Sequence, residues 1–356
     1  MANKNEMEVI EPKYVRFDKD MSSIVKGFAI IFMMFLHCYD DYKYEVPLNF
    51  DHAYMFLHDG FVVCVGIYAF MIGFGYAFSL TKDLRYGWQH IKKLMIPYLI
   101  IFFVFILPTC YHEFFASGWK MMLYTLLGLD VRFFYYNWFI YVFIFAMLVL
   151  PYFTRFIDKN PLSNTLISVA GVYVTQVLFH FLVYPRIDTH FQYMFFNCFT
   201  LTMVYLLGYL FAHEHYYERI PIDKISKPVA LVLSLSVLLL VQFLESRYRI
   251  RAGFMFDFFY APLAIGAIVL IFSKFELKHL RRAMIKLGWA SMYMWFLQAL
   301  FHTPIVRTVY QPIITIFSDI NLVVIWTIVV LFFASWILKT IVDYLLALPK
   351  RLSAAK

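Results

Sequence analysis

Charged residues are scarce in this sequence. Only 15% of the 356 residues are charged, whereas 62% are hydrophobic and 21% are aromatic. Soluble globular domains usually carry about 25% charged residues. The composition therefore excludes an ordinary water-soluble domain and indicates an integral membrane protein.

Several motifs that carry chemistry are missing as well. The sequence has no G-x-S-x-G elbow, no H-E-x-x-H motif and no phosphate-binding glycine loop, so a hydrolase, a metalloprotease or an ATP-driven pump has no support. Its four cysteines lack metal-ligand spacing, and thiols in apolar runs commonly act as small hydrophobic groups. We expect no metal and no permanently bound cofactor. Cys38 and Cys110, near the outer ends of two predicted spans, are the pair to check for a disulfide.

Long apolar runs dominate what is present, and each crossing of a bilayer needs about 20 residues. The net charge of +8 does not indicate nucleic-acid binding, because Lys and Arg form short clusters between these runs. A shorter run, 119–129, predicts an interfacial or re-entrant helix. The sequence therefore predicts an all-α polytopic transmembrane bundle with about ten spans. The predicted spans are residues 22–39, 56–80, 92–110, 137–154, 162–184, 193–213, 228–245, 256–273, 286–303 and 320–346.

The positions of the basic residues predict the orientation. With a cytoplasmic N-terminus, 23 of the 31 Lys and Arg residues lie on the cytoplasmic side, as the positive-inside rule requires when both termini are cytoplasmic. The exception is R-Y-R-I-R at 247–251, predicted as an outer loop that contacts solvent, lipid headgroups or an anionic group. We expect a multi-pass protein of the cell membrane with a cytoplasmic segment at 1–21, a transmembrane domain at 22–346 and a cytoplasmic tail at 347–356. No small-x-small cleavage site follows the first apolar run, so we expect it to be retained.

The first predicted span carries Lys26 and His37, with no ionisable residue between them. Eleven residues advance a helix by about 16 Å and return to nearly the same face. Ionisable groups inside spans usually face a bundle interior or a watery cavity. Alternatively, Lys26 extends to the inner headgroups and His37 lies at the outer interface. These two residues alone leave both interpretations open.

The same spacing suits an acyl-CoA, which has a phosphate-rich nucleotide and a long, thin arm that ends in a thioester. Lys26 would bind phosphate as a point charge. His37 would take the proton from an acceptor hydroxyl as the oxygen attacks the thioester. Asp40, three residues later on roughly the same face, is a candidate to orient the imidazole, or else a plain loop carboxylate.

Four sequence patterns, the second of them in two parts, follow one another along the chain. K-G-F-A-I-I-F-M-M-F-L-H at 26–37 is similar to a pattern of Arg, ten residues and His. It is followed by A-F-M-I-G-F-G-Y-A-F-S and H-I-K-K-L-M-I-P-Y-L-I at 69–100, by N-W-F-I-Y-V-F-I-F-A-M-L-V-L-P at 137–151, and by L-G-W-A-S-M-Y-M-W-F-L-Q-A-L-F at 287–301. In this order they resemble the membrane-bound acyltransferase-3 family, whose members transfer acetyl or other short acyl groups to sugars and cell-surface glycans.

The resemblance implies roles for individual residues. It implies acetyl-CoA or another acyl-CoA as the donor substrate and His37 as the catalytic residue. Lys26 and Lys93 are the candidates for binding the phosphates of the donor, although positive-inside anchoring at the cytoplasmic edge also accounts for Lys93. Trp138 and Gln298 are candidates for substrate binding, although an aromatic belt and helix packing also account for them.

This sequence also departs from the family pattern. Lys26 stands where the family has arginine, and lysine keeps the charge but loses the bidentate fork. Ile72 replaces a usual serine, and Gln298 stands where histidine is common. His302, one turn later, is an alternative occupant of that position.

Together these features favour an O-acetyltransferase that moves an acyl group from acyl-CoA to a sugar hydroxyl of a cell-surface glycan or lipid-linked saccharide. The expected partners are acyl-CoA, that acceptor and membrane lipids, and a separate partner in glycan assembly is left open. A transporter or flippase is the alternative, because a bundle with sparse ionisable groups also describes a proton-coupled carrier. Paired half-helices interrupted by Gly or Pro, which such a carrier predicts, are not evident.

Overall fold

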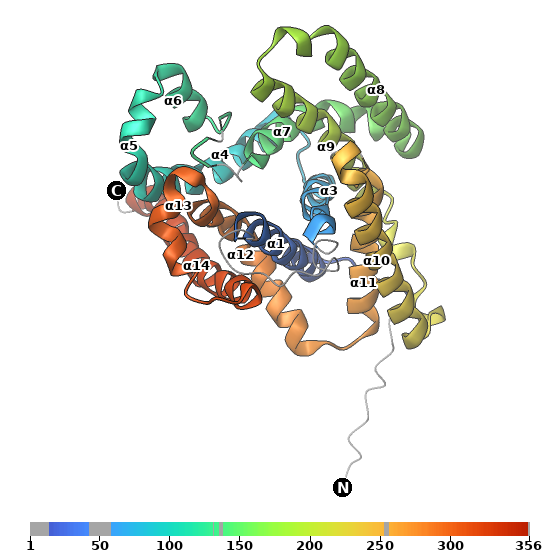
Figure 1. Cartoon of the computed structure of the whole chain (residues 1–356). Helices are drawn as coiled ribbons and strands as arrows, with labels where there is room; N and C mark the ends of the chain where they lie inside the picture. Colours follow the sequence, from blue (N-terminus) through green and yellow to red (C-terminus); the bar gives the residue numbers. More distant parts are fainter. Residues whose placement is uncertain (1–13, 43–57, 131, 135–137, 253–255, 355–356) are drawn as a thin grey trace.

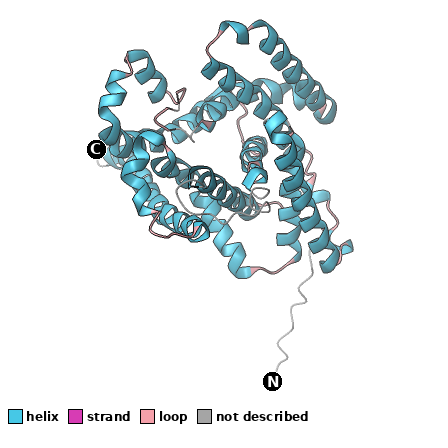
Figure 2. Ribbon diagram, in the orientation of Figure 1, coloured by secondary structure: helices cyan, strands magenta, loops and turns pink. Residues whose placement is uncertain are grey.

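The computed structural model describes residues 14–42, 58–130, 132–134, 138–252 and 256–354, and in this part of the chain every regular element is a helix (Figure 2). The longer helices are α1 (Lys19–Tyr42), α3 (Val63–Ala77), α4 (Leu84–Ile101), α5 (Leu107–Ala116), α7 (Phe139–Ile157), α8 (Pro161–Leu182), α9 (Thr189–His213), α10 (Lys227–Ala252), α11 (Asp257–Lys274), α12 (Lys278–His302) and α14 (Ile320–Ala354). Two short helices are α6 (Trp119–Leu126) and α13 (Pro304–Tyr310). A π-helical turn, Phe102–Ile106, joins α4 to α5.

Nine helical segments of the described residues are long and apolar enough to cross a membrane, which confirms an all-α multi-pass bundle. The predicted span 286–303 corresponds to α12, which is not among the nine because its first half is rich in Lys and Arg. Every residue of α12 from Tyr293 to His302 is buried. A helix surrounded by protein tolerates polar groups that lipid would exclude.

Helices α1 and α3 lie inside a ring formed by the other helices (Figure 1). Helix α1 packs against α12, α3, α14 and α11. The contact with α12 depends on two glycines: a Cβ on Gly288 would lie 1.8 Å from the Ser23 carbonyl oxygen, and a Cβ on Gly27 would lie 2.3 Å from that of Met284. Small residues of this kind let two helix backbones touch. The backbones of α1 and α12 therefore touch where the two helices cross, and side chains of one helix contact those of the other.

Three sequence expectations differ from the structure or are sharpened by it. The R-Y-R-I-R stretch is not a loop, because α10 continues through it to Ala252. Arginine is a good helix former, and after Pro228 at the start of α10 no Gly or Pro occurs until Gly253. The short run at 119–129 forms α6, as expected for a segment too short to cross. All four cysteines are buried as thiols, so Cys38 and Cys110 do not form a disulfide.

Candidate functional site

A cavity of about 550 Å³ opens between α1, α3, α7 and α12, and α4 and α14 each add one residue to its wall. Its lining includes Lys26 and His37, so the two ionisable residues of the first predicted span share one interior space. Lys26 is partly buried and His37 is 7% exposed. The other lining residues with a hydroxyl or an ammonium group are Ser23, Tyr68, Ser291, Tyr293 and Lys339.

The imidazole of His37 is held by Gln298, a residue of α12 that is completely buried. His37 Nδ1 lies 2.9 Å from Gln298 Oε1, and Gln298 Nε2 donates to the Met33 sulfur at 3.4 Å. Because an amide oxygen only accepts hydrogen bonds, this arrangement places the ring proton on Nδ1. In that tautomer Nε2 carries the lone pair of a neutral imidazole, which is the form that acts as a base.

A second histidine lies next to His37 but does not line the cavity. His302 is 1% exposed, and its ring centre lies 5.9 Å from that of His37. The structure thus brings His37, Gln298 and His302 together. Asp40 belongs to α1, but its side chain lies outside the described residues. Gln298 contacts His37 Nδ1, and the only sequence signal for it was its place in the family's histidine position. The orienting role of Asp40 stays a prediction.

Two further sequence candidates have different surroundings. Trp138 lines the cavity just before α7 begins. Lys93 of α4 is exposed and does not line the cavity, whereas its neighbour Leu94 does. Successive helical residues are about 100° apart, so α4 presents Leu94 to the cavity and Lys93 away from it. The structure does not bring Lys93 and Lys26 together in this cavity.

Sequence reasoning missed Lys339 and Trp289. Both line the cavity, and the Lys339 ammonium lies 4.9 Å from the centre of the Trp289 ring. No local pattern connects α14 with α1, so only the packing of the bundle reveals Lys339 as a neighbour of this cavity. The tryptophan sits in the L-G-W segment, but its helix periodicity alone does not distinguish a cavity wall from a lipid-facing ring.

Comparison with known families decides the class of the protein. The acyltransferase domain model of the acyltransferase-3 family matches residues 22–344. The chain belongs to this family. The match runs from α1 into α14 and so includes every helix that lines the cavity. No curated protein and no solved structure matches the chain. The protein is therefore a membrane acyltransferase, which disfavours the carrier alternative.

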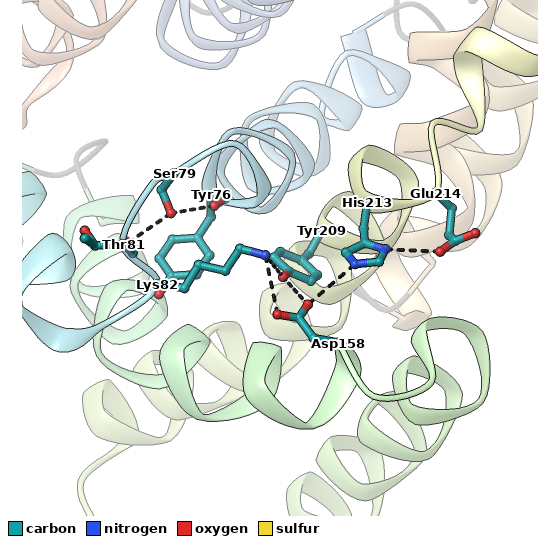
Figure 3. Close-up of polar contacts among 8 residues, drawn as sticks. All are labelled: Tyr76, Ser79, Thr81, Lys82, Asp158, Tyr209, His213 and Glu214. Carbon is teal, nitrogen blue, oxygen red and sulfur yellow. Dashed lines mark hydrogen bonds and ion pairs between the residues drawn. The ribbon is translucent and has the colours of Figure 1, made fainter.

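The acyltransferase has a second polar cluster (Figure 3). Lys82 Nζ donates to the Tyr209 hydroxyl at 2.5 Å and to the Asp158 carboxylate at 3.4 Å, and the Tyr209 hydroxyl donates to Asp158 at 2.5 Å. His213 lies 3.7 Å from Asp158 and hydrogen-bonds Glu214 at 3.1 Å, which lowers the pKa of the Glu214 carboxyl. The cluster joins the ends of α7 and α9 to the loop after α3, and none of these residues lines the cavity. Its geometry indicates a structural role.

Replacing Asp158 with alanine is expected to lower the melting temperature in detergent without changing donor binding. The substitution leaves the buried Tyr209 hydroxyl and Lys82 without their shared acceptor, a loss on the order of 1–3 kcal/mol. Thermal unfolding of the purified protein measures the change. Glu276→Ala is the control, because that carboxylate is 83% exposed in its pair with Lys278. A melting temperature for Asp158→Ala equal to that of the control would contradict the structural role.

Proposed function

We propose that this acyltransferase moves an acyl group, most simply acetyl, from acyl-CoA to a hydroxyl of a sugar in a cell-surface glycan or a lipid-linked saccharide. The observation that supports the proposal is a cavity lined by both Lys26 and His37, with Gln298 packed behind the His37 ring. The family supplies acyl transfer, and this cavity suggests how donor and acceptor meet.

The donor fits the cavity by shape and charge. Lys26 and His37 are about 16 Å apart along α1 by helix rise. A phosphate at Lys26 would be held by a charge-assisted hydrogen bond. The thin arm of the donor would then follow the largely apolar wall that includes Met33 and Trp295, and its thioester would reach His37. One end of the cavity therefore serves binding, and the other end serves chemistry.

The His37 end supplies general base catalysis. As the acceptor hydroxyl oxygen forms a bond to the thioester carbon, its proton moves to His37 Nε2. The carbon–sulfur bond then breaks, and the departing sulfur takes that proton and leaves as the free thiol of CoA. Gln298 accepts the Nδ1 proton's hydrogen bond throughout, which holds the ring in orientation and stabilises its transient positive charge.

The membrane orientation gives this reaction a direction. With the N-terminus in the cytoplasm, Lys26 lies toward the cytoplasmic side and His37 toward the outer side. In this scheme acyl-CoA enters from the cytoplasm, where its phosphates stay, and the acceptor reaches His37 from the opposite side. An acceptor outside the cytoplasm agrees with a saccharide of the cell envelope.

Acetyl-CoA is expected to bind the purified wild-type protein and to bind Lys26→Ala about tenfold more weakly, because a charge-assisted contact contributes on the order of 1.5–3 kcal/mol. Calorimetry in detergent measures both affinities. Lys19→Ala is the matched control: Lys19 lies on the same helix, is exposed and does not line the cavity. A folded wild-type protein that does not bind acetyl-CoA would refute this donor, and an unchanged affinity in Lys26→Ala would remove Lys26 from the site.

A further inference from the structure

The Lys26 end of the cavity has a second cation, which comes from a different helix. Lys339 of α14 lines the cavity, and its Nζ lies over the ring of Trp289 at 4.9 Å, within the range of a cation–π contact. The Trp289 side chain is 48% exposed and that of Lys339 is 21% exposed. A flat aromatic surface and an ammonium group are thus presented side by side at the cavity wall.

The position of this pair along the cavity follows from the packing of α1 on α12. Ser23 touches Gly288, the residue before Trp289, while His37 contacts Gln298. The two helices therefore run in the same direction, and Trp289 lies about 13 Å from Gln298 by helix rise. Lys339 and Trp289 belong to the end of the cavity where Ser23 and Lys26 lie, far from the histidines.

The lysine has an acidic partner on its own helix. Asp343, one turn later on α14, accepts a hydrogen bond from Lys339 Nζ at 2.5 Å, and its side chain is 57% exposed. An ion pair this exposed is weak. A phosphate that carries more charge than a carboxylate would compete with Asp343 for the same ammonium group.

We propose that Lys339 and Trp289 bind the nucleotide end of the donor. This inference rests on the proposed function and adds to it the residues that select a nucleotide-bearing thioester over the bare arm. Lys339 contacts phosphate, the Trp289 indole stacks on the adenine ring, and Asp343 pairs with Lys339 until phosphate displaces it. Stacking of a base on an aromatic side chain strengthens binding whichever base it is, because every base has a flat π-face. With Lys26, the pair puts two cations at the phosphate end, which offsets the single charge that each lysine offers in place of a bidentate arginine fork.

The test compares two ligands, CoA and pantetheine, which share the arm but differ in the nucleotide. Calorimetry with the full-length protein in detergent is expected to show that Lys339→Gln binds CoA about tenfold more weakly and binds pantetheine like wild type. Trp289→Leu is expected to show the same pattern, and it leaves the Lys339–Asp343 pair in place. Asp343→Asn removes the competing charge and is expected to tighten CoA binding about threefold, as befits a weak exposed pair.

A matched control separates a site from general attraction between charges. Lys286→Gln removes the same charge from α12 one turn before Trp289, but Lys286 is exposed and does not line the cavity. It is expected to bind CoA like wild type. Lys339→Arg keeps the charge and is expected to retain most of the wild-type affinity for CoA that Lys339→Gln loses.

Three results would overturn the inference. The first is CoA affinity that stays unchanged in both Lys339→Gln and Trp289→Leu. The second is a loss of CoA affinity in Lys286→Gln as large as that in Lys339→Gln. The third is a loss of pantetheine affinity as large as the loss of CoA affinity, which would assign the residues to binding of the arm or to folding. If Asp343→Asn weakens CoA binding as Lys339→Gln does, Asp343 is not a competitor. Failure of the proposed function is distinguishable, because the wild-type protein would then bind neither CoA nor pantetheine.

Discussion

Replacing His37 with alanine is expected to lower the rate of acyl transfer by about 10²- to 10⁴-fold, the usual contribution of a general base, while acetyl-CoA binding stays close to wild type. His37 lies at the end of the cavity opposite the phosphate site, so its removal takes away proton transfer and leaves the main donor contacts in place. Transfer is measured with labelled acetyl-CoA and membranes that contain the native acceptor, and binding is measured by calorimetry.

The control for this experiment is another histidine. His112→Ala removes an exposed imidazole from α5, a helix that does not line the cavity, and should transfer acyl groups at the wild-type rate. Turnover by His37→Ala at a rate similar to that of His112→Ala, in a protein that melts at the wild-type temperature, would disprove the general-base role.

Gln298→Met is expected to lower the maximal rate on the order of tenfold to a hundredfold with little change in the apparent affinity for donor. Methionine has a similar size but cannot accept the hydrogen bond from His37 Nδ1, so it no longer selects the tautomer whose Nε2 is the base. Losing a buried hydrogen-bond partner costs on the order of 1–3 kcal/mol. Steady-state kinetics at varied acetyl-CoA concentration separate the effect on the rate from the effect on binding.

Gln298→Glu tests whether the acceptor oxygen itself matters. A carboxylate of the same length still accepts the Nδ1 proton's hydrogen bond, so this variant should retain more activity than Gln298→Met. Equal losses in both variants would indicate that Gln298 contributes packing against Met33 and α1 instead of orienting His37. A large increase in the Michaelis constant without a change in rate would assign it to substrate binding.

Much of the site was predictable because the relevant information was local. The spacing of Lys26 and His37 follows from helix periodicity in one predicted span, and the structure places both in one cavity. Trp138 was also predicted as a substrate residue and lines that cavity. Lys93 was predicted from a motif and an edge position, but the rotation of α4 directs it away. The motif around Lys93 does not specify which of the two adjacent side chains, Lys93 or Leu94, faces the cavity.

Partners that come from distant parts of the chain were not predictable. Gln298 reaches His37 because Gly27 and Gly288 let α1 and α12 touch, and a single sequence does not reveal which helices those glycines join. Lys339 adjoins Trp289 through the packing of α14 on α12. The helical continuation of α10 through the R-Y-R-I-R stretch was missed because a cluster of charge was taken as the end of a helix, although arginine supports one.

The sequence by itself determined that this protein is a multi-pass helical bundle, because hydrophobic length and helix period are properties of consecutive residues that a bilayer constrains strongly. The order of its motifs carried the resemblance to the acyltransferase-3 family. The tertiary structure alone decided which side chains meet around the cavity: Gln298 lies behind His37, and Lys339 lies with Trp289 at the other end. Those neighbours depend on the crossing of helices far apart in the chain, and the close packing that sets each crossing is a property of pairs of surfaces, not of any one segment.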